Sequence, residues 1–203
     1  YLRMLWGKKI LEWSSEPREA LDALSDRFDL RLLIPYLSSY EELRFWVEYI
    51  RDRVSMAVPI GAMVETPAGA LDMANWLDIA DFVSVGCNDL MQCLFAANRD
   101  RPEVSAYLDP YAPTLFRFLK QVADGCVSNL QRIQLCGVLP QLHGVLPVLL
   151  GLGYRAFSVD VAHIPFLAQV VRATTIGDAQ CLADDVCGAK QSREVTEKLG
   201  INA

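Results

Sequence analysis

Five short apolar segments alternate with helical patterns along this chain, and this alternation restricts its possible folds more than any other feature. Each segment is bounded by turn-forming or polar residues, as buried strands are. A strand, helix, strand order is typical of parallel sheets, in which each helix crosses back over the sheet. The sequence therefore predicts an α/β fold with strands at 31–36, 61–66, 81–86, 133–138 and 155–160.

Helix-start signals lie between these segments. Ser38 and Glu41 have the spacing of a capping box, in which each side chain bonds a backbone N–H of the first turn. Pro67 and Pro113 stand at the first position of helical patterns, where the missing proline N–H costs nothing. The segment 162–199 predicts two or three further helices.

The number of strand–helix units limits the architecture. A closed (β/α)₈ barrel needs about eight units over about 250 residues, whereas this sequence contains five. The N-terminal segment 1–28 predicts a helix from about Ser15 and no strand before it. The sheet is therefore either open or part of a TIM-type barrel. We expect a single domain over residues 1–203, because no linker-like segment divides the chain.

Charge and cysteine content exclude several classes of protein. The net charge is −6 and the basic residues are scattered, which is unfavourable for nucleic-acid binding. No apolar run reaches the roughly 20 residues that span a bilayer, so membrane insertion is not expected. The six cysteines lack zinc-like spacing and no signal peptide is visible, which favours reduced thiols in the cytoplasm.

Polar or reactive residues follow four successive predicted strands. In parallel α/β folds the loops after the strands meet at one edge, where active sites form. Two carboxylates on neighbouring strands are suited to hold Mg²⁺ against a phosphorylated or 2-oxo acid substrate. Two alternatives remain open: Glu65 could cap the helix at Pro67, and Asn88 with Asp89 could be an N-cap pair. The residues are Glu65, then Asn88 and Asp89, then Cys136, then Ser158 and Asp160.

Other candidate residues are less specific. Arg99 and Arg101 begin a polar, proline-interrupted loop, where an arginine could bind phosphate oxygens or remain solvated. Cys136 could exchange a proton with a substrate enolate, although a buried cysteine is more often a small hydrophobic residue. His143 and His163 have no partner at metal-ligand spacing and are interpreted as surface or packing residues.

Six ordered strings between about Arg31 and Ala189 resemble a known family. They are LLIPYLSSYEELR, GAMVETPAGA, DFVSVGCNDLMQCLFAANR, YAPTLFRFLKQV, LCGVLP and LLGLGYRAFSVDVAHIP. Together they resemble the C-terminal, phosphoenolpyruvate-binding domain of the phosphoenolpyruvate-utilising enzymes. The resemblance is strongest to the Enzyme I (phosphoenolpyruvate-protein phosphotransferase) branch, and pyruvate phosphate dikinase and phosphoenolpyruvate synthase are relatives. The resemblance covers the last five of the family's eight barrel strands.

The resemblance implies roles for five residues. Glu65 and Asp89 match two Mg²⁺ ligands, Asn88 and Arg99 match positions that contact the phosphoryl group, and Cys136 matches the cysteine that protonates the enolate carbon. The implied reaction transfers the phosphoryl group of phosphoenolpyruvate to a histidine on a separate domain, leaving pyruvate. The implied partners are that phosphohistidine domain, a phosphocarrier protein of bacterial sugar transport and a second copy of the chain in a homo-oligomer, such as a homodimer.

The sequence departs from the family pattern in three ways. Val138 stands where the family usually has glutamate, and Cys87 stands where it has threonine. The earlier strands with further phosphate-binding arginines, and the histidine-bearing domain, have no counterpart in the sequence. We therefore expect the chain, which begins with Tyr1, to be a piece of a longer protein or a shortened form that is incomplete for turnover. The alternatives are a non-catalytic phosphoenolpyruvate-binding or interaction module and a Mg²⁺-dependent 2-oxo acid lyase or aldolase.

Overall fold

The computed structural model describes residues 30–54 and 58–201, which form an α/β fold around one five-stranded parallel sheet. The strands follow one another in chain order across the sheet. All five predicted strands are confirmed, with bounds that differ by at most two residues. The strands are β1 (Leu32–Leu37), β2 (Ile60–Val64), β3 (Phe82–Gly86), β4 (Ile133–Cys136) and β5 (Ala156–Ser158).

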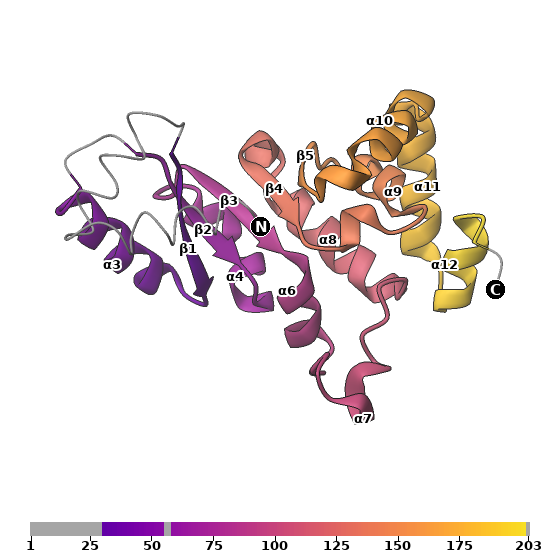
Figure 1. Ribbon diagram of the computed structural model, residues 1–203, viewed down its shortest axis with the longest axis horizontal. Helices are drawn as coiled ribbons and strands as arrows, with labels where there is room; N and C mark the ends of the chain where they lie inside the picture. The colour runs from indigo at the N-terminus through magenta and orange to yellow at the C-terminus, as the bar shows by residue number, and fades with distance from the viewer. Residues whose placement is uncertain (1–29, 55–57, 202–203) are drawn as a thin grey trace.

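Helices connect the strands, and further helices follow the last strand. Figure 1 shows α3 beside β1 at the indigo end and α9 to α12 beyond β5 at the orange and yellow end. The helices are α3 (Tyr40–Arg51), α4 (Pro67–Leu71), α5 (Met73–Trp76), α6 (Cys87–Leu94), α7 (Pro102–Ser105), α8 (Pro113–Gly125), α9 (Val145–Gly151), α10 (Ile164–Ala173), α11 (Ile176–Gly188) and α12 (Ser192–Lys198), with short 3₁₀ turns η1 (Val127–Arg132), η2 (Leu139–Gln141) and η3 (Val161–His163).

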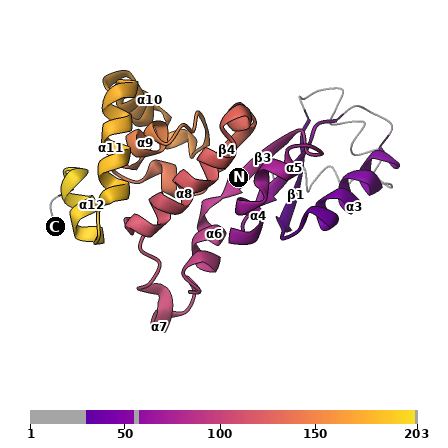
Figure 2. The same ribbon diagram turned by 180° about the vertical axis from the view of Figure 1, so that it is seen from behind.

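Helix α8 lies between the N-terminal and the C-terminal helices of the described structure. It packs against α11 on one side and α4 on the other, and Figure 2 shows it between these elements. Its core-facing side chains, among them Leu115, Phe116 and Leu119, are fully buried. Helix α7 projects away from this body on the long connection between α6 and α8 (Figures 1 and 2).

The helix-start predictions are confirmed at the two prolines and shifted at the capping box. Pro67 and Pro113 open α4 and α8 as expected. In α3 the N-cap is Ser39, whose hydroxyl accepts a hydrogen bond from Glu42 N, and Glu42 accepts one from Ser38 N. The predicted Ser38–Glu41 pairing is therefore wrong by one residue. Three helices occupy 162–199, and the helix predicted from Ser15 lies outside the described residues.

The two faces of the sheet differ in composition. Successive residues of a strand point to opposite faces. One face carries fully buried aliphatic side chains such as Val64, Val85 and Leu135, which pack against the helices. The other face carries Met63, Gln134 and Cys136, which are only partly buried. Polar and reactive side chains are therefore confined to one face.

Strands β1 and β5 form the two edges of the sheet within the described residues. The sheet is not closed there, in agreement with the prediction of a partial barrel. The single domain expected over residues 1–203 stays a prediction. No helix in 30–54 or 58–201 has the length and hydrophobicity required to cross a membrane. All six cysteines are free thiols.

Candidate functional site

The carboxyl ends of β2, β3, β4 and β5 are aligned in one row. Val64 pairs with Val85, Gly86 pairs with Cys136, and Cys136 pairs with Ser158. The residue after Val64 is Glu65, so the register brings it level with Gly86 and Cys136. This alignment places the sequence-predicted residues at the carboxyl end of the sheet.

Glu65 is a buried carboxylate held by the backbone of β1. The residue is 8% exposed, and its Oε2 accepts a hydrogen bond of 3.0 Å from Tyr36 N. Tyr36 has a φ of 57°, a conformation that is uncommon outside glycine, and it coincides with a register shift between Ile34 and Leu37. This irregularity at the end of β1 turns the Tyr36 N–H toward the carboxylate.

Glu65 does not cap α4, which removes one of the alternatives. The N-cap is Thr66, whose Oγ1 accepts a hydrogen bond of 3.1 Å from Gly69 N. The Thr66 hydroxyl also donates to Leu37 O over 3.4 Å. The Glu65 carboxylate is therefore available for another role.

Gly86 makes room for this carboxylate. A Cβ at position 86 would lie 2.7 Å from Cγ of Glu65, closer than real Cβ atoms approach, and 3.0 Å from its Oε1. Burial raises the pKa of Glu65, the hydrogen bond from the Tyr36 backbone lowers it, and the negative charge of Asp89 raises it further. A cation bound by both carboxylates would offset this unfavourable charge interaction.

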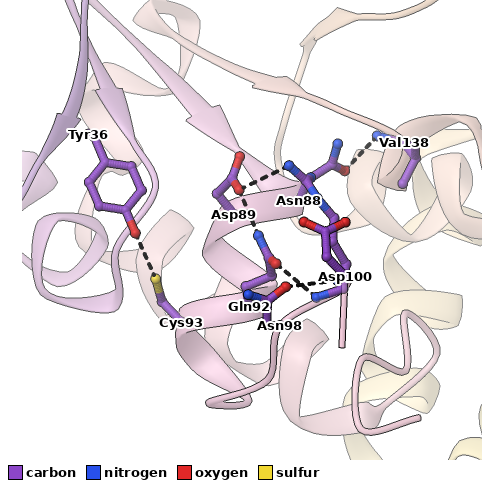
Figure 3. Close-up of polar contacts among 9 residues, drawn as sticks. Tyr36, Asn88, Asp89, Gln92, Cys93, Asn98, Asp100 and Val138 are labelled. Atoms are coloured by element: carbon purple, nitrogen blue, oxygen red, sulfur yellow. Dashed lines mark hydrogen bonds and ion pairs between the residues drawn. The ribbon is translucent and has the colours of Figure 1, made fainter. Parts of the chain in front are cut away.

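Asn88 and Asp89 lie in the first turn of α6, directly after β3. The N-cap of α6 is Gly86, and no side chain caps this helix, so the predicted N-cap pair is not formed. Figure 3 shows both side chains at the start of α6, facing away from its axis. Asp89 Oδ1 accepts a hydrogen bond of 2.7 Å from Gln92 Nε2 and lies 3.6 Å from Arg99 Nη2.

Arg99 is therefore brought to the site, whereas Arg101 is not. The Arg99–Asp89 pair is partly solvated, with side-chain exposures of 53% and 32%. Ion pairs of this kind stabilise a fold by only about 0–1 kcal/mol, so the guanidinium can exchange this contact for a phosphate at little cost. Arg101 is exposed and precedes α7.

The amide of Asn88 has a fixed orientation. Its Oδ1 accepts a hydrogen bond of 3.0 Å from Val138 N, so its Nδ2 keeps two N–H groups for a ligand (Figure 3). Gly137 allows this contact through its φ of 99°, and a Cβ there would lie 2.7 Å from Asn88 Oδ1. Val138 is 53% exposed, and its backbone N–H is the group that contacts Asn88.

Cys136 ends β4 on the same face of the sheet. Its thiol donates to Val85 O over 3.3 Å. Burial raises the pKa of Cys136, a hydrogen bond with the Ser84 hydroxyl lowers it, and the charges of Glu65 and Asp89 raise it. The net effect keeps the thiol protonated at neutral pH, which is the state that a proton donor requires.

The remaining predicted residues have structural or surface positions. Asp160 Oδ1 accepts a hydrogen bond from Ala162 N and so caps η3. Ser158 is exposed at the end of β5. His143 and His163 are exposed, in agreement with their interpretation as surface residues.

Sequence reasoning missed two glutamines and a backbone amide. Gln92 bridges Asp89 and Arg99, and its position three residues after Asp89 on a helix was a usable signal. Gln141 donates to Gly137 O over 2.9 Å and accepts from Asp160 N over 3.1 Å, linking the loops after β4 and β5. The Tyr36 amide gave no signal, because a backbone N–H is common to nearly every residue.

The donors at this edge fit a hard divalent cation. Within the described residues no cluster of three or more histidine, cysteine or acidic side chains could hold a metal by itself. Mg²⁺ does not need one, since it is commonly bound by one or two carboxylates together with water and substrate phosphate oxygens. Glu65 and Asp89 are the carboxylates that could hold such a cation, with Asn88 and Arg99 as donors for an anion.

Comparisons with known proteins show which family the chain belongs to. Residues 15–176 match the family described as "PEP-utilising enzyme, PEP-binding domain", where PEP is phosphoenolpyruvate. The chain is 30% identical over 178 residues to a phosphoenolpyruvate-protein phosphotransferase of Buchnera aphidicola subsp. Schizaphis graminum, covering 83% of this chain and 31% of the relative. It is 30% identical over 180 residues to multiphosphoryl transfer protein 1 of Escherichia coli (strain K12), covering 83% and 22%.

A third relative extends the matched region. The chain is 28% identical over 192 residues to a Salmonella typhimurium (strain LT2) protein named "Phosphoenolpyruvate-dependent phosphotransferase system", covering 90% of this chain and 26% of the relative. The chain thus spans about a third or less of the length of the curated relatives it matches.

Proposed function

Because this chain belongs to the PEP-utilising enzymes, as their PEP-binding domain, we propose that it binds phosphoenolpyruvate together with Mg²⁺ and supports transfer of its phosphoryl group to a protein histidine. The acceptor would be a histidine on another domain, which passes the group to a phosphocarrier protein of the sugar phosphotransferase system. A cytoplasmic location and a homo-oligomeric state are parts of the same proposal. Residues 1–203 would form one domain of the complete enzyme.

One observation carries the proposal: Glu65 follows β2 and Asp89 lies in the first turn of the helix after the neighbouring strand β3, with phosphate donors beside Asp89. Two such carboxylates are unfavourable together in a partly buried site unless a cation is bound. The donors are Nδ2 of Asn88 and the guanidinium of Arg99. Carboxylates for a metal next to donors for an anion are what a metal–phosphate ligand requires.

In the proposed mechanism, the residues of this chain bind and orient the substrate. Glu65 and Asp89 would hold Mg²⁺, which supplies positive charge to neutralise the phosphate and carboxylate of the substrate. Arg99 and Asn88 donate hydrogen bonds to phosphoryl oxygens and align them for in-line transfer to the histidine. The P–O bond of phosphoenolpyruvate breaks, and the enolate of pyruvate is released from the phosphoryl group.

Cys136 would complete the reaction. Its S–H gives a proton to the C3 carbon of the enolate, forming pyruvate, and the thiolate regains a proton from water. The raised pKa of Cys136 keeps the proton on the thiol until the enolate forms. The family glutamate that borders this thiol is replaced by Val138, so the proposal assigns no acid–base role to position 138.

Calorimetry with phosphoenolpyruvate tests this function. We expect binding by the wild-type chain to require Mg²⁺ and to be lost in Glu65→Ala, because the cation loses one of two carboxylate ligands. Glu48→Ala is the matched control, since Glu48 is an exposed α3 residue paired with Arg44. Binding that persists without Mg²⁺, or in Glu65→Ala, would contradict the proposal.

The open sheet favours a second candidate function, a non-catalytic interaction module. Edge strands with unpaired backbone groups recruit partners, and β1 and β5 each have one neighbour in the described sheet. Calorimetry and light scattering together separate the two: binding of phosphoenolpyruvate with Mg²⁺ favours the first function, whereas an assembly that binds none favours the second. The 2-oxo acid lyase or aldolase reading stays a prediction, to be tested by pyruvate release from 2-oxo acid aldols.

A further inference from the structure

Gln92 uses both ends of its side-chain amide at the site. It lies in α6 one turn after Asp89, and its Nε2 donates to Asp89 Oδ1 over 2.7 Å. Its Oε1 accepts from Arg99 N over 2.9 Å. Figure 3 shows the Gln92 amide between Asp89 and the loop that carries Asn98 and Asp100. One side chain therefore contacts a candidate cation ligand and the backbone of a candidate phosphate donor.

The backbone of Gln92 also fixes the start of this loop. Its carbonyl accepts a hydrogen bond of 3.0 Å from Ala97 N, and Ala96 has a φ of 49°, which reverses the chain after α6. The reversal directs Arg99 back along α6, so that its Nη2 lies 3.6 Å from Asp89 Oδ1. Asp89, Gln92 and Arg99 form a closed set of three mutual contacts.

These contacts determine which oxygen of Asp89 can bind a cation. The hydrogen bond from Gln92 and the ion pair with Arg99 are both made to Oδ1. Oδ2 is then the oxygen that can coordinate a metal. A glutamine suits this place because its amide is both donor and acceptor, whereas glutamate would face Asp89 with a second negative charge.

We propose that Gln92 is a positioning residue that orients the Asp89 carboxylate for the cation and couples it to Arg99, so that metal and phosphate sites form as one unit. The proposal rests on the proposed function, since it concerns the same site. Gln92 acts through Asp89 and Arg99 and does not touch the substrate. Residues that orient metal ligands typically change metal affinity by about 10- to 100-fold when they are replaced.

Binding of Mn²⁺, measured as loss of the free Mn²⁺ signal in electron paramagnetic resonance with phosphoenolpyruvate present, tests the proposal. We expect Gln92→Met, which keeps the length of the side chain but not its hydrogen bonds, to weaken Mn²⁺ binding by about 10- to 100-fold. Gln92→Glu should weaken phosphoenolpyruvate binding in calorimetry, because it places a further negative charge beside Asp89 and Arg99. Gln131→Met is the control. Gln131 donates to Ser128 O just before β4, at the amino end of the sheet and away from the candidate site.

The outcomes separate this proposal from the proposed function. If the wild-type chain binds neither Mn²⁺ nor phosphoenolpyruvate, both fall. If it binds them and Gln92→Met binds Mn²⁺ with wild-type affinity, only the role of Gln92 falls. Melting curves of each variant identify a merely structural effect, which would lower the melting temperature of Gln92→Met below that of Gln131→Met and leave Mn²⁺ affinity of the folded protein unchanged.

Discussion

At the residue scale, two glycines decide where the polar side chains of the site can lie. Gly86 leaves space for Glu65, and Gly137 leaves space for the Asn88 amide. The polar residues alone do not predict either contact, because each polar side chain also needs a neighbouring residue without a side chain to leave space for it. Their positions after two predicted strands made Glu65 and Asp89 candidates. The absence of a side chain at Gly86 explains how Glu65 fits.

Replacing Gly86 tests this explanation. In Gly86→Ala the new Cβ meets Glu65 Cγ at 2.7 Å, so Glu65 or the strand has to shift. Overpacking of this kind costs about 1–3 kcal/mol of unfolding free energy, and the displaced carboxylate should also lose Mn²⁺ binding. Urea unfolding and Mn²⁺ titration measure the two effects.

Gly125→Ala provides the control for this substitution. Gly125 ends α8, and a Cβ there meets nothing within 4 Å. Alanine should therefore leave Mn²⁺ binding intact and change stability by no more than about 1 kcal/mol. Equal effects of the two substitutions would show that the contact with Glu65 is unimportant.

At the element scale, strands were predictable and their exact ends were not. Apolar runs identified all five strands, because their alternate side chains face a buried helix layer. The segment SSYEEL contains two serines and two glutamates at capping-box spacing, so spacing alone could not select one pair. The buried positions of Leu43 and Val47 fix the phase of α3 and hence select Ser39 and Glu42.

The start of α4 offers a test at this scale. Thr66→Ala removes the hydroxyl that caps the helix at Gly69 N and should lower the unfolding free energy by about 0.5–2 kcal/mol. Thr66→Ser keeps the hydroxyl and should restore most of this loss. Denaturant unfolding compares the stabilities of the three proteins. A Thr66→Ala variant as stable as the wild type would show that another group, such as Glu65, caps α4.

Contacts made by loops were the least predictable part of the site. The bridging role of Gln92 depends on the chain reversal at Ala96, which brings Arg99 back toward α6. The orientation of Asn88 depends on the Val138 amide, which lies 50 positions away in the sequence. Pattern analysis places residues at strand ends, but such distant pairs are determined by tertiary structure.

At the scale of the whole molecule, the sheet ends at β1 and β5 within the described residues, and the chain covers 22% to 31% of the length of the relatives compared above. The candidate site in the described residues contains two carboxylates, an amide, a guanidinium and a thiol. We expect this set to suffice for binding, whereas phosphoryl transfer needs an acceptor histidine from another domain. Binding and turnover should therefore be separable in this chain.

The most direct test of the central claim is an anomalous difference map from crystals grown with Mn²⁺ and phosphoenolpyruvate. The account predicts one strong peak between the carboxylates of Glu65 and Asp89, about 2.0–2.2 Å from an oxygen of each, with the phosphate of the ligand on Asn88 and Arg99. Phosphoenolpyruvate bound with no metal peak at these two carboxylates, or a peak that contacts only one of them, would contradict it.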